Sequence, residues 1–145
     1  MLQELFGLGG RRVLVTGSSK GIGFALARGL GQAGASVVLN ARTEATLNAA
    51  AEALVKEGID ATAMALDVTD AAAVAAGIDA LEASGQSIDI LINNAGMQFR
   101  TALQDFPVDA WHQLMRTNLD SAFFVGQAVA RHMIERGRGK VINIC

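Results

Sequence analysis

Short apolar runs alternate with longer stretches of helical periodicity along most of the 145-residue chain. Runs rich in β-branched residues predict strands, and longer stretches with apolar residues three or four apart predict helices that end at Gly. The expected strands are 12–16, 36–40, 61–66, 88–93 and 141–144, and the expected helices are 22–33, 43–56, 70–83 and about 107–136. Because each strand is apolar on both faces, the pattern predicts an α/β fold with a parallel sheet between helices.

The unusual polar residues of the chain follow the predicted strands. Thr16-Gly17 follows the first strand, Asn40-Ala41-Arg42 ends the second, Asp67 follows the third, and residues 93–96 close the fourth. The carboxyl ends of parallel strands meet at one edge, where ligands of such sheets bind at the point of reversed strand order. We therefore expect one site at this edge.

The loop after the first strand is rich in Gly and leads into a helix. Such a loop lets backbone N–H groups approach a pyrophosphate and aims the start of a helix at its charge. Its spacing, G-x-x-x-G-x-G, differs from the G-x-G-x-x-G dinucleotide fingerprint and from a P-loop. The alternative is a tight turn with Gly at its corners. The candidate residues are Gly17, Ser18, Ser19, Lys20, Gly21, Ile22 and Gly23.

The end of the second strand favours a phosphorylated ribose. In dinucleotide folds an acidic residue about 20 positions past the Gly-rich loop binds the ribose hydroxyl, whereas Arg accepts a 2′-phosphate. Here Asn40 and Arg42 stand in that window, and Glu44 better suits the first turn of the next helix. Arg42 with Lys20 therefore favours, by charge and fork geometry, a phosphorylated ribose such as that of NADP(H). The alternative is two solvated surface cations.

Two further motifs follow the third and fourth strands. Asp67 is suited to accept from an adenine amino group while Val68 packs on the ring, although Asp67 would also serve as a helix N-cap. The amides of 93–94 are suited to brace neighbouring strands, and Ala95 and Gly96 leave room for a flat sugar. An ordinary Asn/Gly turn is the alternative.

The long predicted helix has an apolar stripe that contains one amide. The stripe consists of Trp111, Met115, Ala122, Val125, Val129 and Met133, and Asn118 lies within it. A buried amide lowers stability unless it finds hydrogen-bond partners, so Asn118 either ties the helix to itself or works in a site. His112 and His132 have no ligand partners at useful spacing and are expected at the surface.

Charge and composition exclude several classes of protein. Twelve basic and fourteen acidic residues give a formal charge of −2 without a basic block, so nucleic acid and anionic membranes are poor candidates as partners. The single Cys excludes a disulfide framework and a cysteine-based zinc site, and no metal site is expected. The first residues contain no long apolar stretch, so we expect a cytoplasmic domain without signal peptide or membrane span.

In combination, the motifs resemble those of the short-chain dehydrogenase/reductase family, in a register that runs from residue 11 to 145. The resemblance rests on four motifs in order, namely 16–23, Asp67-Val68, 93–96 and Asn118 within 116–119. It implies a Rossmann-type, doubly wound parallel sheet that is truncated after the fifth strand. Residues 1–145 would then be an NADP-binding domain that is incomplete at its C-terminus.

The resemblance also implies roles for individual residues. Ser18, Ile22 and the three Gly of the loop would hold the pyrophosphate, and Arg42 with Lys20 the 2′-phosphate. Asp67-Val68 would take the adenine. The ribose on the nicotinamide side would lie against Asn94, Ala95 and Gly96. Asn118 matches the family's catalytic Asn, which fixes a water in the proton relay.

The amino-acid sequence of segments 94–100 and 125–133 is similar to that of family members that interconvert gluconate and 5-ketogluconate. This similarity implies hydride transfer between NADP(H) and a sugar acid or another carbonyl or alcohol substrate. From its charge alone, Arg100 is a candidate for the substrate carboxylate. The resemblance further implies that the intact protein is a homotetramer.

The family's catalytic Ser, Tyr and Lys all follow the fifth strand, and the chain contains no Tyr. Tyr is the general acid of this chemistry. We therefore expect this chain by itself to bind dinucleotide weakly or not at all and to be inactive. The alternatives are a non-enzymatic dinucleotide-binding or interaction module, and a half-enzyme completed by another chain. The apolar fifth strand is also expected to be an exposed edge prone to association.

Overall fold

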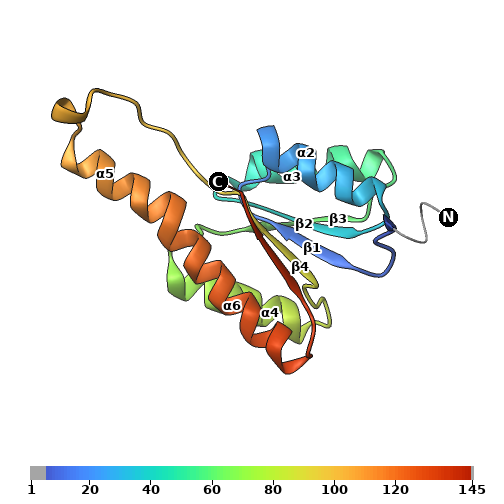
Figure 1. The fold of residues 1–145 in the computed structure, drawn as a ribbon. Coiled ribbons are helices and arrows are strands. Elements are labelled where there is room, and N and C mark those ends of the chain that lie inside the picture. Colours follow the sequence, from blue (N-terminus) through green and yellow to red (C-terminus); the bar gives the residue numbers. More distant parts are fainter. Residues whose placement is uncertain (1–5, 145) are drawn as a thin grey trace.

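The computed structural model describes residues 6–144, which form one parallel sheet between two layers of helices (Figure 1). The strand order is β3-β2-β1-β4-β5, and it reverses between β1 and β4. This order confirms the Rossmann-type, doubly wound fold. The strands are β1 (Arg12–Val15), β2 (Ser36–Ala41), β3 (Ala61–Ala65), β4 (Ile90–Asn93) and β5 (Lys140–Asn143). The helices are α2 (Gly21–Gln32), α3 (Glu44–Lys56), α4 (Ala71–Ala83), α5 (Val108–Met115) and α6 (Ser121–Glu135).

The sheet separates two hydrophobic cores. Successive side chains of a strand point to opposite faces, so Val13 and Val15 of β1 pack into one core and Leu14 into the other. The first core includes Leu47 and Leu54 of α3, and α2 lies over the same face. The second core is formed with residues of α4 and α6. Burial on both faces confirms the pattern predicted for the central strands.

The two edge strands differ from that prediction. Most of β3 is exposed or half-buried, and all four residues of β5 are exposed. Val141 and Ile142 are 44% and 48% exposed. The expectation that every strand is apolar and buried on both faces was therefore wrong for β3 and β5, because an edge strand has a neighbour on one side only. The expected exposure of the fifth strand is confirmed.

The long predicted helix is continuous but contains a π-helical turn, Arg116–Asp120, between α5 and α6. The N–H of Ser121 donates to the carbonyl of Arg116, five residues back, while the Ser121 hydroxyl donates to the carbonyl of Thr117 at 2.6 Å. The side chain thus takes an acceptor that the backbone would use in an α-helix, which favours the wider turn.

The predicted buried stripe of this helix is only half correct. Val125, Val129 and Met133 are buried against the sheet, but Trp111 is 53% exposed and Asn118 is also exposed. The reason is that α5 extends past the end of the sheet (Figure 1), so the sheet does not cover it. Within residues 6–144, no helix is both long and apolar enough to cross a membrane.

Candidate functional site

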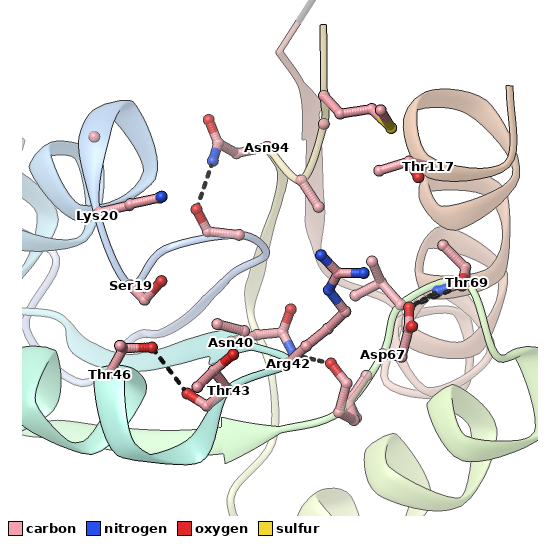
Figure 2. A pocket seen from close by; sticks show the side chains of 18 of the residues that line it. Ser19, Lys20, Asn40, Arg42, Thr43, Thr46, Asp67, Thr69, Asn94 and Thr117 are labelled. Carbon is pink, nitrogen blue, oxygen red and sulfur yellow. Dashed lines mark hydrogen bonds between the residues drawn. The ribbon is translucent and has the colours of Figure 1, made fainter. Parts of the chain in front are cut away.

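A cleft of about 770 Å³ lies at the carboxyl edge of the sheet, beside the point where the strand order reverses (Figure 2). Its walls come from the loop after β1, from the ends of β2, β3 and β4, and from the end of α5 with the π-helical turn. The structure therefore gathers most of the predicted cofactor residues around one cavity. These are Gly17, Ser19, Lys20, Gly21, Asn40, Arg42, Asp67, Val68, Asn94, Ala95 and Gly96.

Three other residues of the predicted loop are outside the cavity lining. The Ser18 side chain is fully buried; its hydroxyl donates to the Val15 carbonyl at 2.7 Å and accepts from the Asn40 N–H at 3.0 Å. Gly23 is also buried, and a Cβ there would lie 2.5 Å from the Asn94 amide nitrogen. Ile22 is 68% exposed. Ser18 and Gly23 therefore shape the loop from beneath it.

The Gly residues that line the cavity solve two different steric problems. Gly17 has φ +62°, and a Cβ there would lie 2.8 Å from the Ala95 Cα, so it allows the loop to pack against the end of β4. Gly21 has φ +61° but has open space where a Cβ would be. The loop can therefore turn into α2 without covering its first N–H groups, as an anion-binding helix start requires.

Two cations reach into the cleft from different elements. Figure 2 shows Lys20, from the loop before α2, and Arg42, from the end of β2, both directed into the cavity. Within residues 6–144 neither of them forms an ion pair. In the same part of the chain, the starts of α2 and α3 have no side-chain cap. Lys20 and Arg42 therefore add positive charge to that of the two helix starts at this end of the cleft. Acids close to it include Asp67, whose pKa Arg42 helps to lower, and Glu44 in the first turn of α3.

Asp67 is the one acid of the cleft lining, and its carboxylate is already hydrogen-bonded. Oδ1 accepts from the Thr69 N–H at 2.9 Å and from the Thr69 hydroxyl at 2.8 Å. The backbone N–H bond lowers the pKa of Asp67 most; burial opposes this, and the Thr69 hydroxyl and Arg42 lower it further. The alternative role as helix N-cap belongs to Asp70, which accepts from Ala72 and Ala73 at the start of α4.

The two amides at the end of β4, Asn93 and Asn94, brace the sheet, as predicted. Asn94 Nδ2 donates to the carbonyls of Thr16 and Gly17, both at 3.1 Å, and its N–H donates to the Thr16 hydroxyl at 2.9 Å. Asn93 Nδ2 donates to Asn143 Oδ1 on β5 and to the Ala122 carbonyl on α6. The ends of β1, β4 and β5 are thereby fixed relative to one another, which holds Ala95 and Gly96 against the cleft.

Asn118 clamps the next segment of the same loop. Its Oδ1 accepts from the Met97 N–H at 2.7 Å, and its Nδ2 donates to the Met97 carbonyl at 2.9 Å. The premise that Asn118 is buried was wrong, but the requirement for partners was correct. The amide ties the π-helical turn to residues 96–97 rather than to its own helix, and it lies beside the cavity and not in its lining.

Several lining residues escaped the sequence analysis. They include Thr43 and Thr46 at the start of α3, Met97 after β4, and Gln113 and Thr117 near the π-helical turn. Their positions depend on how the helices lean over the sheet edge, although Thr43 follows Arg42 directly in the sequence. Arg100 is exposed and outside the cavity lining. Across residues 6–144, no group of three or more His, Cys, Asp or Glu residues is placed to hold a metal ion.

Comparison with known proteins agrees with this geometry. Residues 11–145 match the short chain dehydrogenase family. The chain belongs to this family.

Two curated relatives and one solved structure show the similarity in detail. The chain is 54% identical to a gluconate 5-dehydrogenase of Gluconobacter oxydans over 142 residues, 98% of this chain and 56% of that protein. It is 44% identical to 5-keto-D-gluconate 5-reductase of Escherichia coli, over 99% of this chain and 57% of that protein. A crystal structure of a gluconate 5-dehydrogenase from Burkholderia cenocepacia, in complex with NADP and tartrate, superposes on all of this chain and 57% of its own, with a TM-score of 0.96 and 52% identity. The chain thus spans little more than half the length of these relatives.

Proposed function

We propose that this chain is the NADP(H)-binding portion of an oxidoreductase that transfers hydride between NADP(H) and a sugar acid such as gluconate or 5-ketogluconate. The observation that carries the proposal is the electropositive end of the cleft, where Arg42 and Lys20 stand beside the uncapped start of α3. A 2′-phosphate distinguishes NADP(H) from NAD(H), and Arg is suited to bind it. The NADP complex of the similar Burkholderia enzyme supports the same cofactor.

The residues present fit this cofactor along the length of the cleft. Ser19, Gly21 and the start of α2 would receive the pyrophosphate, and Arg42, Lys20 and Thr43 the 2′-phosphate. Asp67 and Val68 would take the adenine, and Ala95 and Gly96 the second ribose. Gly21, with no atom within 4 Å of a Cβ position, leaves the close approach that a phosphate needs.

The cofactor would supply the hydride, and the described residues would bind and orient it. Asn118 holds residues 96–97 at the nicotinamide end through its two bonds to Met97. Because it is an amide, it cannot act as a general acid, and the chain has no Tyr. We propose that the 145-residue chain alone binds NADP(H) weakly and does not turn over.

A half-enzyme completed by another chain is a second candidate function. The exposed apolar residues of β5 favour it, because an unpaired parallel edge accepts a further strand. For the intact protein we propose a cytoplasmic homotetramer, with Arg100 as a contact for the substrate carboxylate.

The test is a titration of the protein with NADPH and, separately, with NADH, each up to millimolar concentration, in which NMR measures binding. We expect NADPH to bind about tenfold more tightly, and Arg42→Gln to remove that preference, since one charge-assisted hydrogen bond has about this worth. Gln keeps a polar amide but removes the charge and shortens the side chain. Equal affinity for both cofactors in the unmodified protein would refute the NADP(H) assignment. Gluconate oxidation by mass-verified chain would refute its inactivity.

A further inference from the structure

Asn40 occupies an unusual position at the end of β2. It is 1% exposed, yet it lies between the two segments that form the adenosine end of the proposed cofactor site. Its Nδ2 donates to the carbonyl of Met64 at 3.0 Å and to the carbonyl of Leu66 at 3.2 Å. Both acceptors lie on the neighbouring segment, at and just after the end of β3.

The backbone of Asn40 is bound on its other side to the loop after β1. The Ser18 N–H donates to the Asn40 carbonyl at 2.9 Å, and the Asn40 N–H donates to the Ser18 hydroxyl at 3.0 Å. One residue therefore fixes three segments of the cleft wall: the phosphate loop, the end of β2 and the end of β3.

The segments that Asn40 joins carry two of the proposed cofactor contacts. Arg42 follows it by two positions, and Leu66, whose carbonyl it binds, directly precedes Asp67. A neutral amide can donate to two carbonyl oxygens at once. A carboxylate in its place would repel both of them, and an apolar residue would leave them without this donor.

We propose that Asn40 is a positioning residue that sets the separation between Arg42 and the Asp67-Val68 pair, and hence the affinity for a 2′-phosphorylated adenosine. The inference rests on the proposed function. It differs from a cofactor contact, because the donating group of Asn40 faces β3 and not the cavity.

The experiment compares Asn40→Asp with the unmodified protein, using adenosine 2′,5′-bisphosphate as the probe and calorimetry or NMR to measure affinity. The substitution keeps the size of the side chain but removes both donors, and we expect affinity to fall about tenfold or more. Leu54→Ala is the control, because Leu54 is fully buried in the core under α3 and away from the cleft lining. Leu54→Ala should lower the free energy of unfolding without lowering the affinity for the probe.

The pH dependence separates positioning from a general loss of stability. A buried carboxyl beside two carbonyl oxygens has a raised pKa, and its protonated form regains one donor. The ratio of the two dissociation constants should therefore shrink from about pH 8 to about pH 6, whereas the ratio for Leu54→Ala should stay constant.

The outcomes distinguish the two proposals. If the unmodified protein fails to bind the probe, the proposed function fails and this inference fails with it. If it binds and Asn40→Asp binds equally well, only the role of Asn40 is overturned. Should Asn40→Asp fail to fold, Asn40→Ser gives the same comparison, and unchanged affinity of its folded fraction would equally overturn the role.

Discussion

The two edges of the sheet use polar side chains in opposite ways. At the amino edge, charged groups bind one another: Asp89 accepts from the Arg12 N–H and lies 3.6 Å and 3.5 Å from the guanidinium groups of Arg11 and Arg138. Arg136 binds Glu82 at 2.6 Å and the Ile88 carbonyl at 2.7 Å. At the carboxyl edge, neutral Asn, Ser and Thr side chains bind the backbone, and Lys20 and Arg42 form no ion pair within residues 6–144.

This difference separates stability from binding. A cation that is already neutralised by a protein carboxylate has little attraction left for a ligand anion, and removing a buried partner is costly. A cation kept unpaired adds little to stability but remains available. We infer that the amino edge closes the fold, whereas neutral side chains join the ends of the strands at the carboxyl edge, which leaves Lys20 and Arg42 available to a ligand.

The largest expected effect is at the amino edge. Arg136→Met removes both bonds of a guanidinium whose partner, Glu82, is only 6% exposed. Glu82 would keep a single hydrogen bond, from the Ile88 N–H. We expect the free energy of unfolding to fall by about 3 kcal/mol, measured by chemical denaturation, with no loss of dinucleotide affinity per folded molecule. Adding Glu82→Gln should recover part of the stability. A lower dinucleotide affinity of folded Arg136→Met would contradict the assignment of stability to one edge and binding to the other.

A smaller effect tests the helix starts at the carboxyl edge. Asp70 caps α4 with bonds of 3.0 Å to the N–H groups of Ala72 and Ala73, whereas Thr43 makes no side-chain cap at α3 within the described residues. Asp70→Ala should lower the free energy of unfolding by about 1 kcal/mol. Thr43→Ala should change the free energy of unfolding by less than about 0.5 kcal/mol and should instead lower the affinity for NADPH. Equal stability losses in thermal unfolding of the two variants would contradict this contrast.

The smallest effect concerns the charge of Asp67. Thr69→Val removes the hydroxyl donor but keeps the backbone N–H, so the pKa of Asp67 should rise part of the way towards its ordinary value. A lowered pKa stabilises the fold at neutral pH, and that stabilisation is lost as pH falls through the folded-state pKa. The acid-dependent loss below about pH 4 should therefore shrink in the variant. An NMR titration of the Asp67 carboxyl carbon measures the shift, and an unchanged midpoint would exclude a role for the hydroxyl.

Much of the fold was predictable because it depends on local pattern. The apolar runs of β1, β2 and β4 and the Gly stops gave the elements, and the polar residues after the strands gave the cleft. The contacts that escaped prediction join distant residues, such as Arg136 and Glu82, which are 54 positions apart. Asn40 lines the cleft as expected, but the bonds from its amide to the carbonyls of Met64 and Leu66 were not predicted, because spacing alone does not show which way an amide group faces.

The limit is sharpest in the long helix. Its periodicity was read as one stripe, but the π-helical turn depends on a single hydroxyl, that of Ser121. The helix propensities of the neighbouring residues do not predict the π-helical turn. The exposure of Trp111 and Asn118 follows from the reach of α5 beyond the sheet, which is a property of the assembled fold and not of the segment.

The π-helical turn also makes the chain sensitive to residue count at one place. Each residue of an α-helix advances the helix by about 100°, and the wider turn absorbs an extra residue without bending the axis. Deleting a single residue from Arg116–Asp120 would therefore leave a helix of ordinary appearance. It would rotate α5 relative to α6 by more than a quarter turn and move Gln113 away from the cleft. The number of residues in this short segment therefore determines which face of α5 is turned toward the site.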